Sequence, residues 1–153
     1  MPNFQTQRRV AHSAAEMFDL VADVEQYPQF VPMCTGLRVR SRSMDGEGRE
    51  VLIAAMDVGY KAIRETFASK VTLDRARLQV VVDYLDGPFK QGRNIWSFAD
   101  LEGGAASRVD FAISYEFRSR VLALLMGSMF DAAFRRFAQA FEARADAVYG
   151  RGG

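Results

Sequence analysis

Residue types that carry acid–base, nucleophilic or metal chemistry are few in this chain and do not form a recognisable cluster. The 153 residues include one cysteine, Cys34, and one histidine, His12. A lone cysteine cannot form an internal disulfide or a cysteine metal site, and a lone histidine excludes a two-histidine zinc site. We expect His12 to be a local hydrogen-bonding group at a strand-to-helix junction, and Cys34 to be a small buried hydrophobe.

General acid–base catalysis needs a positioned donor and acceptor with tuned pKa values. The sequence contains no nucleophile elbow and no phosphate-binding loop, and no pair of acidic residues is marked as a catalytic couple. We therefore expect no catalytic residues and no metal. The acidic residues on the predicted strands are Asp57, Glu65, Asp83 and Glu116.

Three stretches are unusually apolar for the places they occupy. The loop DVEQYPQFVPMC, residues 23–34, carries two prolines and two aromatic residues, whereas connecting loops are normally polar. It predicts either a mobile lip at a cavity mouth or a plug that closes the core. The loop DGPFKQG, residues 86–92, embeds Pro88 and Phe89, which could form a second lip or a packing anchor.

The third stretch is VLALLMGSMF, residues 121–130, which is apolar on all sides of a helix. Part of it must lie under loops, against a partner or against lipid. The flanking Arg118 and Arg120 suit an interfacial segment near anionic headgroups. The alternatives are ligand entry, tight loop packing and a dimer seam, and Gly127 could loosen the helix there as a gate.

Composition indicates one ordinary globular domain, residues 1–150, with a disordered tail at 151–153. The net charge of +1 removes the electrostatic argument for a dedicated nucleic-acid binder, so we expect no DNA partner. The N-terminal residues are too polar for a signal peptide, and the longest apolar run is about half of the roughly 20 residues that a spanning helix needs. We expect a bacterial cytoplasmic protein, free or peripheral on the inner membrane.

The elements follow from changes in hydrophobic period. Residues 4–11 predict a strand, and SAAE at 13–16 is a capping box that begins a short helix. Asp23 can cap a second helical turn, which Pro28 should end. From Leu37 the period becomes two and hairpin turns recur as far as Phe117. Ser119 can then cap a long helix to about Tyr149, with its apolar stripe at Met126, Met129, Phe130, Ala133, Phe134, Phe137, Ala140, Phe141 and Val148.

This order predicts an α+β protein with a curved antiparallel sheet of about six to seven strands wrapped on a long C-terminal helix. Two short helices follow the first strand. One helix on a wide curved sheet favours a cavity between the two, and this is the START-like, or helix-grip, plan.

Three motifs, YPQFVPMC (27–34), DGPFKQGRNIWSF (86–98) and ISYEFRSRVLALLM (113–126), resemble the coenzyme Q-binding START-like family of the polyketide cyclase/dehydrase-like superfamily. This family includes RatA-type ribosome-association toxins. The resemblance implies non-enzymatic binding of a polyisoprenoid quinone such as ubiquinone, in respiration or quinone biosynthesis, with no other cofactor required. For the toxin branch it implies a ribosomal subunit as partner and blocked subunit association. Some relatives are cyclases, which makes an enzyme a third alternative. Met33 stands where family members often carry tryptophan.

We expect the apolar ligand to lie against the two loops, the sheet face and the start of the long helix. In a fold with a cavity, the core face and the ligand wall are the same surface. Alternation also places Arg38, Arg40 and Arg42 on one strand face, either simply solvated or in contact with rRNA phosphates or anionic lipid. The expected ligand-binding residues are Tyr27, Phe30, Val31, Pro32, Met33, Phe67, Tyr84, Pro88, Phe89, Trp96, Phe98, Phe111, Ile113, Leu125, Met126, Met129, Phe130 and Phe134.

Overall fold

The computed structural model describes residues 3–60 and 62–150, so the predicted tail at 151–153 lies outside the described residues. These residues form seven strands, two α-helices and two short 3₁₀ helices, η1 and η2. The elements are β1 (Asn3–Val10), α1 (Ala14–Ala22), η1 (Val24–Gln29), β2 (Cys34–Met44), β3 (Glu50–Tyr60), β4 (Ile63–Asp74), β5 (Gln79–Tyr84), β6 (Phe89–Leu101), η2 (Glu102–Gly104), β7 (Ala106–Phe117) and α2 (Arg120–Tyr149).

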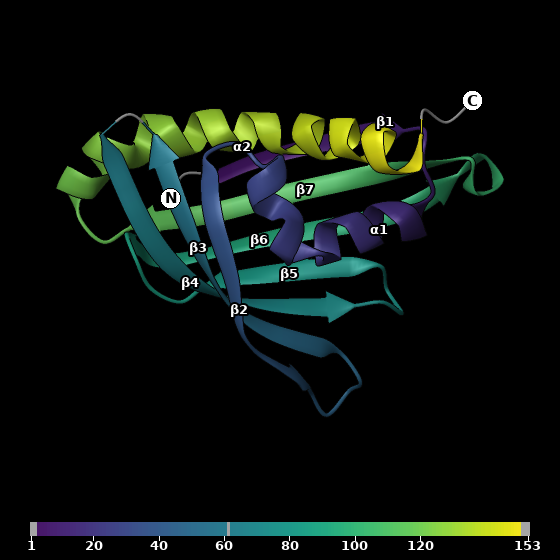
Figure 1. Cartoon of the computed structure of the whole chain (residues 1–153), viewed down its shortest axis with the longest axis horizontal. Coiled ribbons are helices and arrows are strands. Elements are labelled where there is room, and N and C mark those ends of the chain that lie inside the picture. Colours follow the sequence, from purple (N-terminus) through teal and green to yellow (C-terminus); the bar gives the residue numbers. More distant parts are fainter. Residues whose placement is uncertain (1–2, 61, 151–153) are drawn as a thin grey trace.

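The strands form one antiparallel sheet in the order β1-β7-β6-β5-β4-β3-β2. Figure 1 shows α2 running along the length of the molecule and strands β2 to β4 bending toward its N-terminal half. Helices α1 and η1 follow β1, as predicted. The fold is therefore START-like, with a curved sheet gripping the C-terminal helix.

The predicted capping box begins α1. The Ser13 hydroxyl accepts from the Glu16 backbone N–H at 3.1 Å, and the Ser13 N–H donates to the Glu16 carboxylate at 3.1 Å. The next two expectations were wrong. The Asp23 side chain does not cap η1, and Pro28 lies inside η1 rather than ending it. Proline fits there because its fixed φ suits a 3₁₀ turn, and the turn ends only after Gln29.

The long helix is capped as predicted, because the Ser119 hydroxyl accepts from the Leu122 N–H at 3.2 Å. Its 30 residues extend about 45 Å at 1.5 Å per residue. Val148 was expected in the buried stripe but is 50% exposed. The last turn is anchored instead by Tyr149, which donates to the Glu16 carbonyl, and by Asp146, which lies 2.7 Å from His12. The hydrogen bond of His12 is therefore tertiary rather than local.

Buried alternate residues of β4 to β7 face α2 and form the core. The longest alternation is in β7, where Val109, Phe111, Ile113, Tyr115 and Phe117 are all buried, as their parity predicts. From α2 the core receives Met126, Met129, Phe130, Ala133, Phe134, Ala138, Phe141 and Ala145.

Candidate ligand-binding cavity

A cavity of about 60 Å³ lies between the sheet and α2, closed by the segment Tyr27–Met33, which we call the rim segment. The volume of this cavity is well below the ~300–1,000 Å³ that is typical of ligand-binding pockets. Its lining residues are Val24, Tyr27, Val31, Pro32, Met33, Leu37, Ala54, Met56, Val58, Phe67, Ser69, Val71, Val82, Tyr84, Asn94, Trp96, Met129, Phe130, Ala133, Phe134, Phe137 and Phe141.

The strand register explains why the sheet side of the cavity is continuous. Met56 on β3 pairs with Phe67 on β4, and Ser69 on β4 pairs with Tyr84 on β5. Directly opposed residues point to the same face of a sheet. Gly92 leaves room for the Tyr84 ring, because a Cβ at position 92 would lie 2.4 Å from that ring.

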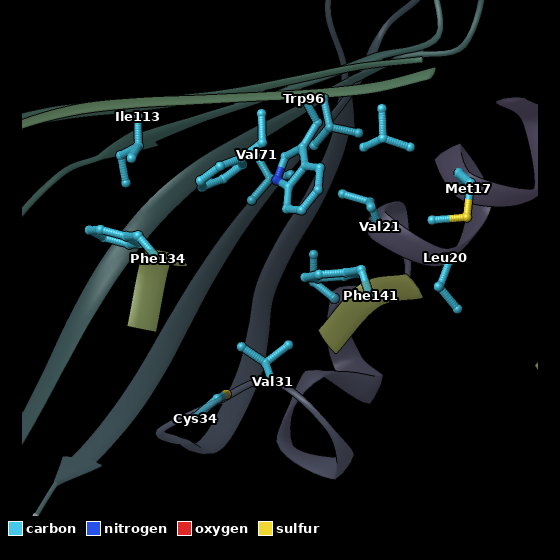
Figure 2. Close-up of a cluster of buried hydrophobic side chains, with 14 of the residues drawn as sticks. Met17, Leu20, Val21, Val31, Cys34, Val71, Trp96, Ile113, Phe134 and Phe141 are labelled. Atoms are coloured by element: carbon cyan, nitrogen blue, oxygen red, sulfur yellow. The ribbon is translucent and has the colours of Figure 1, made fainter. Parts of the chain in front are cut away.

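Aromatic side chains from three parts of the chain meet in the cavity wall. Trp96 on β6 packs edge-to-face on Phe141 of α2, with ring centroids 4.8 Å apart. Figure 2 shows Trp96, Phe134, Phe141 and Val31 pointing toward one another from the sheet, the helix and the rim segment. Trp96 is the only tryptophan of the chain, so its fluorescence reports on this wall.

The rim segment is held down by α2. Phe141 packs edge-to-face against Tyr27 at 5.3 Å and against Phe30 at 5.0 Å. Arg144 donates to the Gln29 carboxamide at 2.8 Å and places its guanidinium 5.2 Å from the centre of the Phe30 ring. Met33 ends the segment with a φ of 67°, a left-handed conformation that is unfavourable for a residue other than glycine. The closed rim is thus well packed but strained at its end.

Several residues expected to contact the ligand line the cavity, and others do not. Phe98 packs under Phe18 of α1, and Phe89 is buried between Tyr84 and Phe117, where it anchors the start of β6. The expected residues in the lining are Tyr27, Val31, Pro32, Met33, Phe67, Tyr84, Trp96, Met129, Phe130 and Phe134; those outside it are Phe30, Pro88, Phe89, Phe98, Phe111, Ile113, Leu125 and Met126.

Sequence reasoning missed the polar part of the lining, Ser69 and Asn94, together with several small or aliphatic residues. The signal was present, because Ser69 has the strand parity of Phe67, and Asn94 has that of Trp96. The unexpected lining residues are Val24, Leu37, Ala54, Met56, Val58, Ser69, Val71, Val82, Asn94, Ala133, Phe137 and Phe141.

The described lining contains no acidic, basic or histidine side chain. Burial raises the pKa of the Tyr84 phenol well above its ordinary value, and a hydrogen bond with Asn94 opposes that rise. Burial likewise raises the pKa of Tyr27. Both phenols therefore stay neutral at physiological pH, and the cavity surface is uncharged.

An exposed apolar stripe leads along α2 toward the cavity. Val121 is 64% exposed and Leu125 is 61% exposed, whereas Met129 is buried and lines the cavity. Residues four apart lie on the same helix face, so these three side chains form a continuous row from solvent to the cavity. Leu124 beside them is 84% exposed.

The predicted arginine stripe is divided between the two faces of β2. A β-bulge between Val39 and Ser41 makes Arg40 an extra residue, so Arg42 pairs with Leu52 and shares the face of Val39. A bulge reverses the alternation that follows it, which explains why the prediction of one arginine face was wrong.

Two of these arginines are already in ion pairs. Arg38 binds both carboxylate oxygens of Asp57, at 2.8 and 3.2 Å, and Arg42 binds Glu25 at 2.6 Å. The hydrogen bonds from Arg38 and Thr66 lower the pKa of Asp57 to about 2. Arg40 is exposed and has no ion pair within the described residues.

Residues 3–60 and 62–150 contain neither a cluster of metal-ligating side chains nor a helix that could span a membrane. No group of three or more His, Cys, Asp or Glu side chains is placed to hold a metal ion. No helix in these ranges has the length and apolar character needed to cross a membrane.

The profile of a family described as polyketide cyclase / dehydrase and lipid transport matches residues 10–142. The chain belongs to this family. Among curated members similar to it, the ribosome association toxin RatA of Escherichia coli (strain K12) is 35% identical, over 97% of this chain and 90% of the toxin. The mitochondrial coenzyme Q-binding protein COQ10 homolog B of Xenopus laevis is 31% identical, over 91% of this chain and 56% of that protein.

Several solved structures share this fold. The 18 kDa protein CC1736 of Caulobacter crescentus is 34% identical, with a TM-score of 0.76 over 98% of this chain and 99% of that one. The START superfamily protein of Mycobacterium smegmatis has a TM-score of 0.78 at 22% identity, covering 95% of this chain and 98% of that one. The Zhui aromatase/cyclase of a Streptomyces species has a TM-score of 0.79 at 16% identity, covering 95% and 93%.

Proposed function

We propose that this protein binds a polyisoprenoid quinone such as ubiquinone in the cavity between the sheet and α2, as a carrier and without catalysing a reaction. The observation that carries the proposal is the uncharged, mostly aromatic and aliphatic lining, joined to an exposed apolar row on α2. Such a surface suits a long apolar tail. The coenzyme Q-binding relative supports the quinone as head group.

Burial of the tail supplies the affinity. Each methylene group removed from water contributes about 0.8 kcal/mol, so a few isoprene units suffice for tight binding without specific polar contacts. A cavity of about 60 Å³ cannot hold such a tail. The cavity must therefore enlarge to hold the ligand, and we assign this change to the rim segment, which would move away from Phe141 and Arg144.

We place the entry at the N-terminal end of α2 and propose that this end docks on the cytoplasmic face of an anionic membrane. Val121, Leu124 and Leu125 would enter the headgroup boundary, as in an interfacial amphipathic helix. Arg118 and Arg120 next to them, each exposed, would contact lipid phosphates. A quinone could then pass from the bilayer to the cavity along the row that ends at Met129.

A second candidate is ribosomal subunit binding, which the toxin RatA relatives favour. Phosphate contacts would have to come from exposed cations such as Arg40, because Arg38 and Arg42 are already paired with carboxylates. A cyclase activity, as in the aromatase/cyclase neighbours, would require turnover of a polyketide-like substrate that an Asp or Glu substitution abolishes.

A single purified preparation tests both the quinone-carrier and the ribosome-binding candidates. The protein is purified from a quinone-making bacterial host, extracted with organic solvent and analysed by mass spectrometry for ubiquinone. We expect a quinone in near-stoichiometric amount. Protein without quinone that co-sediments with ribosomal subunits in low salt, and is released in high salt, would overturn the carrier proposal in favour of the ribosomal one.

A further inference from the structure

Three polar side chains stand side by side in the otherwise apolar lining of the cavity. Ser69, Tyr84 and Asn94 come from β4, β5 and β6, which are adjacent in the sheet. Ser69 pairs directly with Tyr84, so their Cβ atoms are about 5 Å apart. Asn94 pairs with Val82, two residues before Tyr84 on the same face. We call these three residues the polar cluster.

Asn94 is the least satisfied member of the polar cluster. Its side chain is only 4% exposed, and its carboxamide oxygen has no hydrogen-bond partner in the described part of the chain. Asn94 forms a side-chain hydrogen bond with Tyr84. Because the carboxamide oxygen is unpaired, the amide N–H₂ group is the part of Asn94 that donates to the Tyr84 hydroxyl. Buried polar atoms in native proteins nearly always have hydrogen-bond partners. A bound ligand that donates a hydrogen bond would therefore satisfy this oxygen.

The residues that line the cavity indicate which kind of hydrogen-bond donor would suit the Asn94 oxygen. The lining has no cation, and the acceptor is a neutral amide oxygen, so a neutral O–H group is its natural partner. The Ser69 and Tyr84 hydroxyls can each accept or donate, which allows them to contact a second oxygen of the same head group. A ring with phenolic hydroxyls meets these requirements, whereas a ring with only carbonyl oxygens would place lone pairs against the Asn94 oxygen.

We infer that the cavity prefers the reduced form of its ligand, a hydroquinone, over the oxidised quinone, and that Asn94 determines this preference. The inference rests on the proposed function, since it assigns the head group of the same ligand. A site built to bind a hydroxyl discriminates against an analogue that lacks it, because the polar atoms of the site are then left unpaired. The protein would thus hold the quinol in the dry cavity and release the quinone more readily.

The test compares decylubiquinone with chemically reduced decylubiquinol under anaerobic conditions. Binding is followed by quenching of Trp96, whose ring lies in the cavity wall. We expect the wild-type protein to bind the quinol about tenfold more tightly than the quinone. In Asn94→Leu, which has a similar shape without the orphaned oxygen, the two affinities should come within roughly threefold of each other.

A matched control comes from Ser107. Its hydroxyl is also fully buried and without a partner in the described residues, but it does not line the cavity. Ser107→Ala should therefore keep the tenfold preference. This variant separates an effect of the cavity from a general effect of removing a buried polar atom.

The outcomes distinguish this inference from the function on which it rests. Equal binding of both forms by the wild-type protein, or a preference that persists in Asn94→Leu, overturns the inference and leaves the carrier proposal in place. Loss of the preference in Ser107→Ala also overturns the role of Asn94. Failure of the wild-type protein to bind either form overturns both proposals.

Discussion

Cys34 shows what burial does to a single residue at the end of the rim segment. It is buried where β2 begins, as expected for a small hydrophobe, and its thiol lies 3.6 Å from the Gly36 carbonyl. Burial raises the pKa of the Cys34 thiol to about 11, from an ordinary value of 9.0. The folded state therefore holds this proton at a pH where the unfolded chain has lost it.

This shift predicts a loss of stability with rising pH. Above pH 9 the unfolded state binds fewer protons than the folded state, so the free energy of unfolding falls as pH rises from 9 toward 11. Between pH 8 and pH 10, urea titrations should show the wild-type protein losing about 1 kcal/mol more than Cys34→Ala loses. Parallel pH profiles for the two proteins would contradict the raised pKa.

At the scale of elements, the N-terminal part of α2 exposes apolar and arginine side chains in a combination that core packing does not require. Its first turns expose large apolar side chains beside arginines, whereas the same helix buries one face from Met126 onward. An exposed apolar row that continues into a cavity lining suits both membrane contact and ligand entry.

Leu125→Glu tests the docking role of this helix end. The side chain is 61% exposed, so the fold should persist. Sedimentation with phosphatidylglycerol vesicles should show partitioning reduced about tenfold or more, because a buried leucine contributes about 1.5–3 kcal/mol and a carboxylate is repelled by anionic lipid. The control is Val148→Glu, at the other end of α2, where the side chain is 50% exposed. Unchanged partitioning in Leu125→Glu, or an equal loss in both variants, would remove this helix end from the docking surface.

At the scale of the whole molecule, the core and the proposed ligand wall are one surface. Trp96, Phe134 and Phe141 belong to the main hydrophobic cluster and also line the cavity. A ligand that fills the cavity therefore adds contacts to the core itself. Binding and folding stability should be linked across the entire domain.

This linkage predicts thermal stabilisation by the ligand. At about 100 times the dissociation constant, decylubiquinone should add ~2.7 kcal/mol and raise Tm by roughly 5–10 °C. Differential scanning calorimetry measures the shift, with decane as the control for a tail without a head group. No change in Tm at concentrations that saturate Trp96 quenching would show that the probe binds outside the core.

Patterns that depend only on neighbouring residues were predictable. The capping box at Ser13, the cap at Ser119 and the alternation from Val109 to Phe117 follow from local backbone geometry, and each lies where it was expected. The order of these elements predicted the START-like plan, and the structure confirms it. The division of the arginines could not be predicted, because the bulge at Arg40 arises from pairing with β3, a strand that the local alternation does not describe.

The sequence by itself determined the order of the helices and strands and most of the buried side chains, since both depend on hydrophobic period, although Val148 is exposed. Only the tertiary structure decided which buried residues line the cavity. Trp96 and Phe98 share a strand and a face, yet Trp96 meets Phe141 while Phe98 is covered by Phe18 of α1. The same holds for Asn94, whose parity marks it as buried but whose unpaired oxygen appears only when β5, β6 and α2 are assembled around it. The position of a covering element relative to a strand is set by contacts distant in sequence, and no local pattern carries that information.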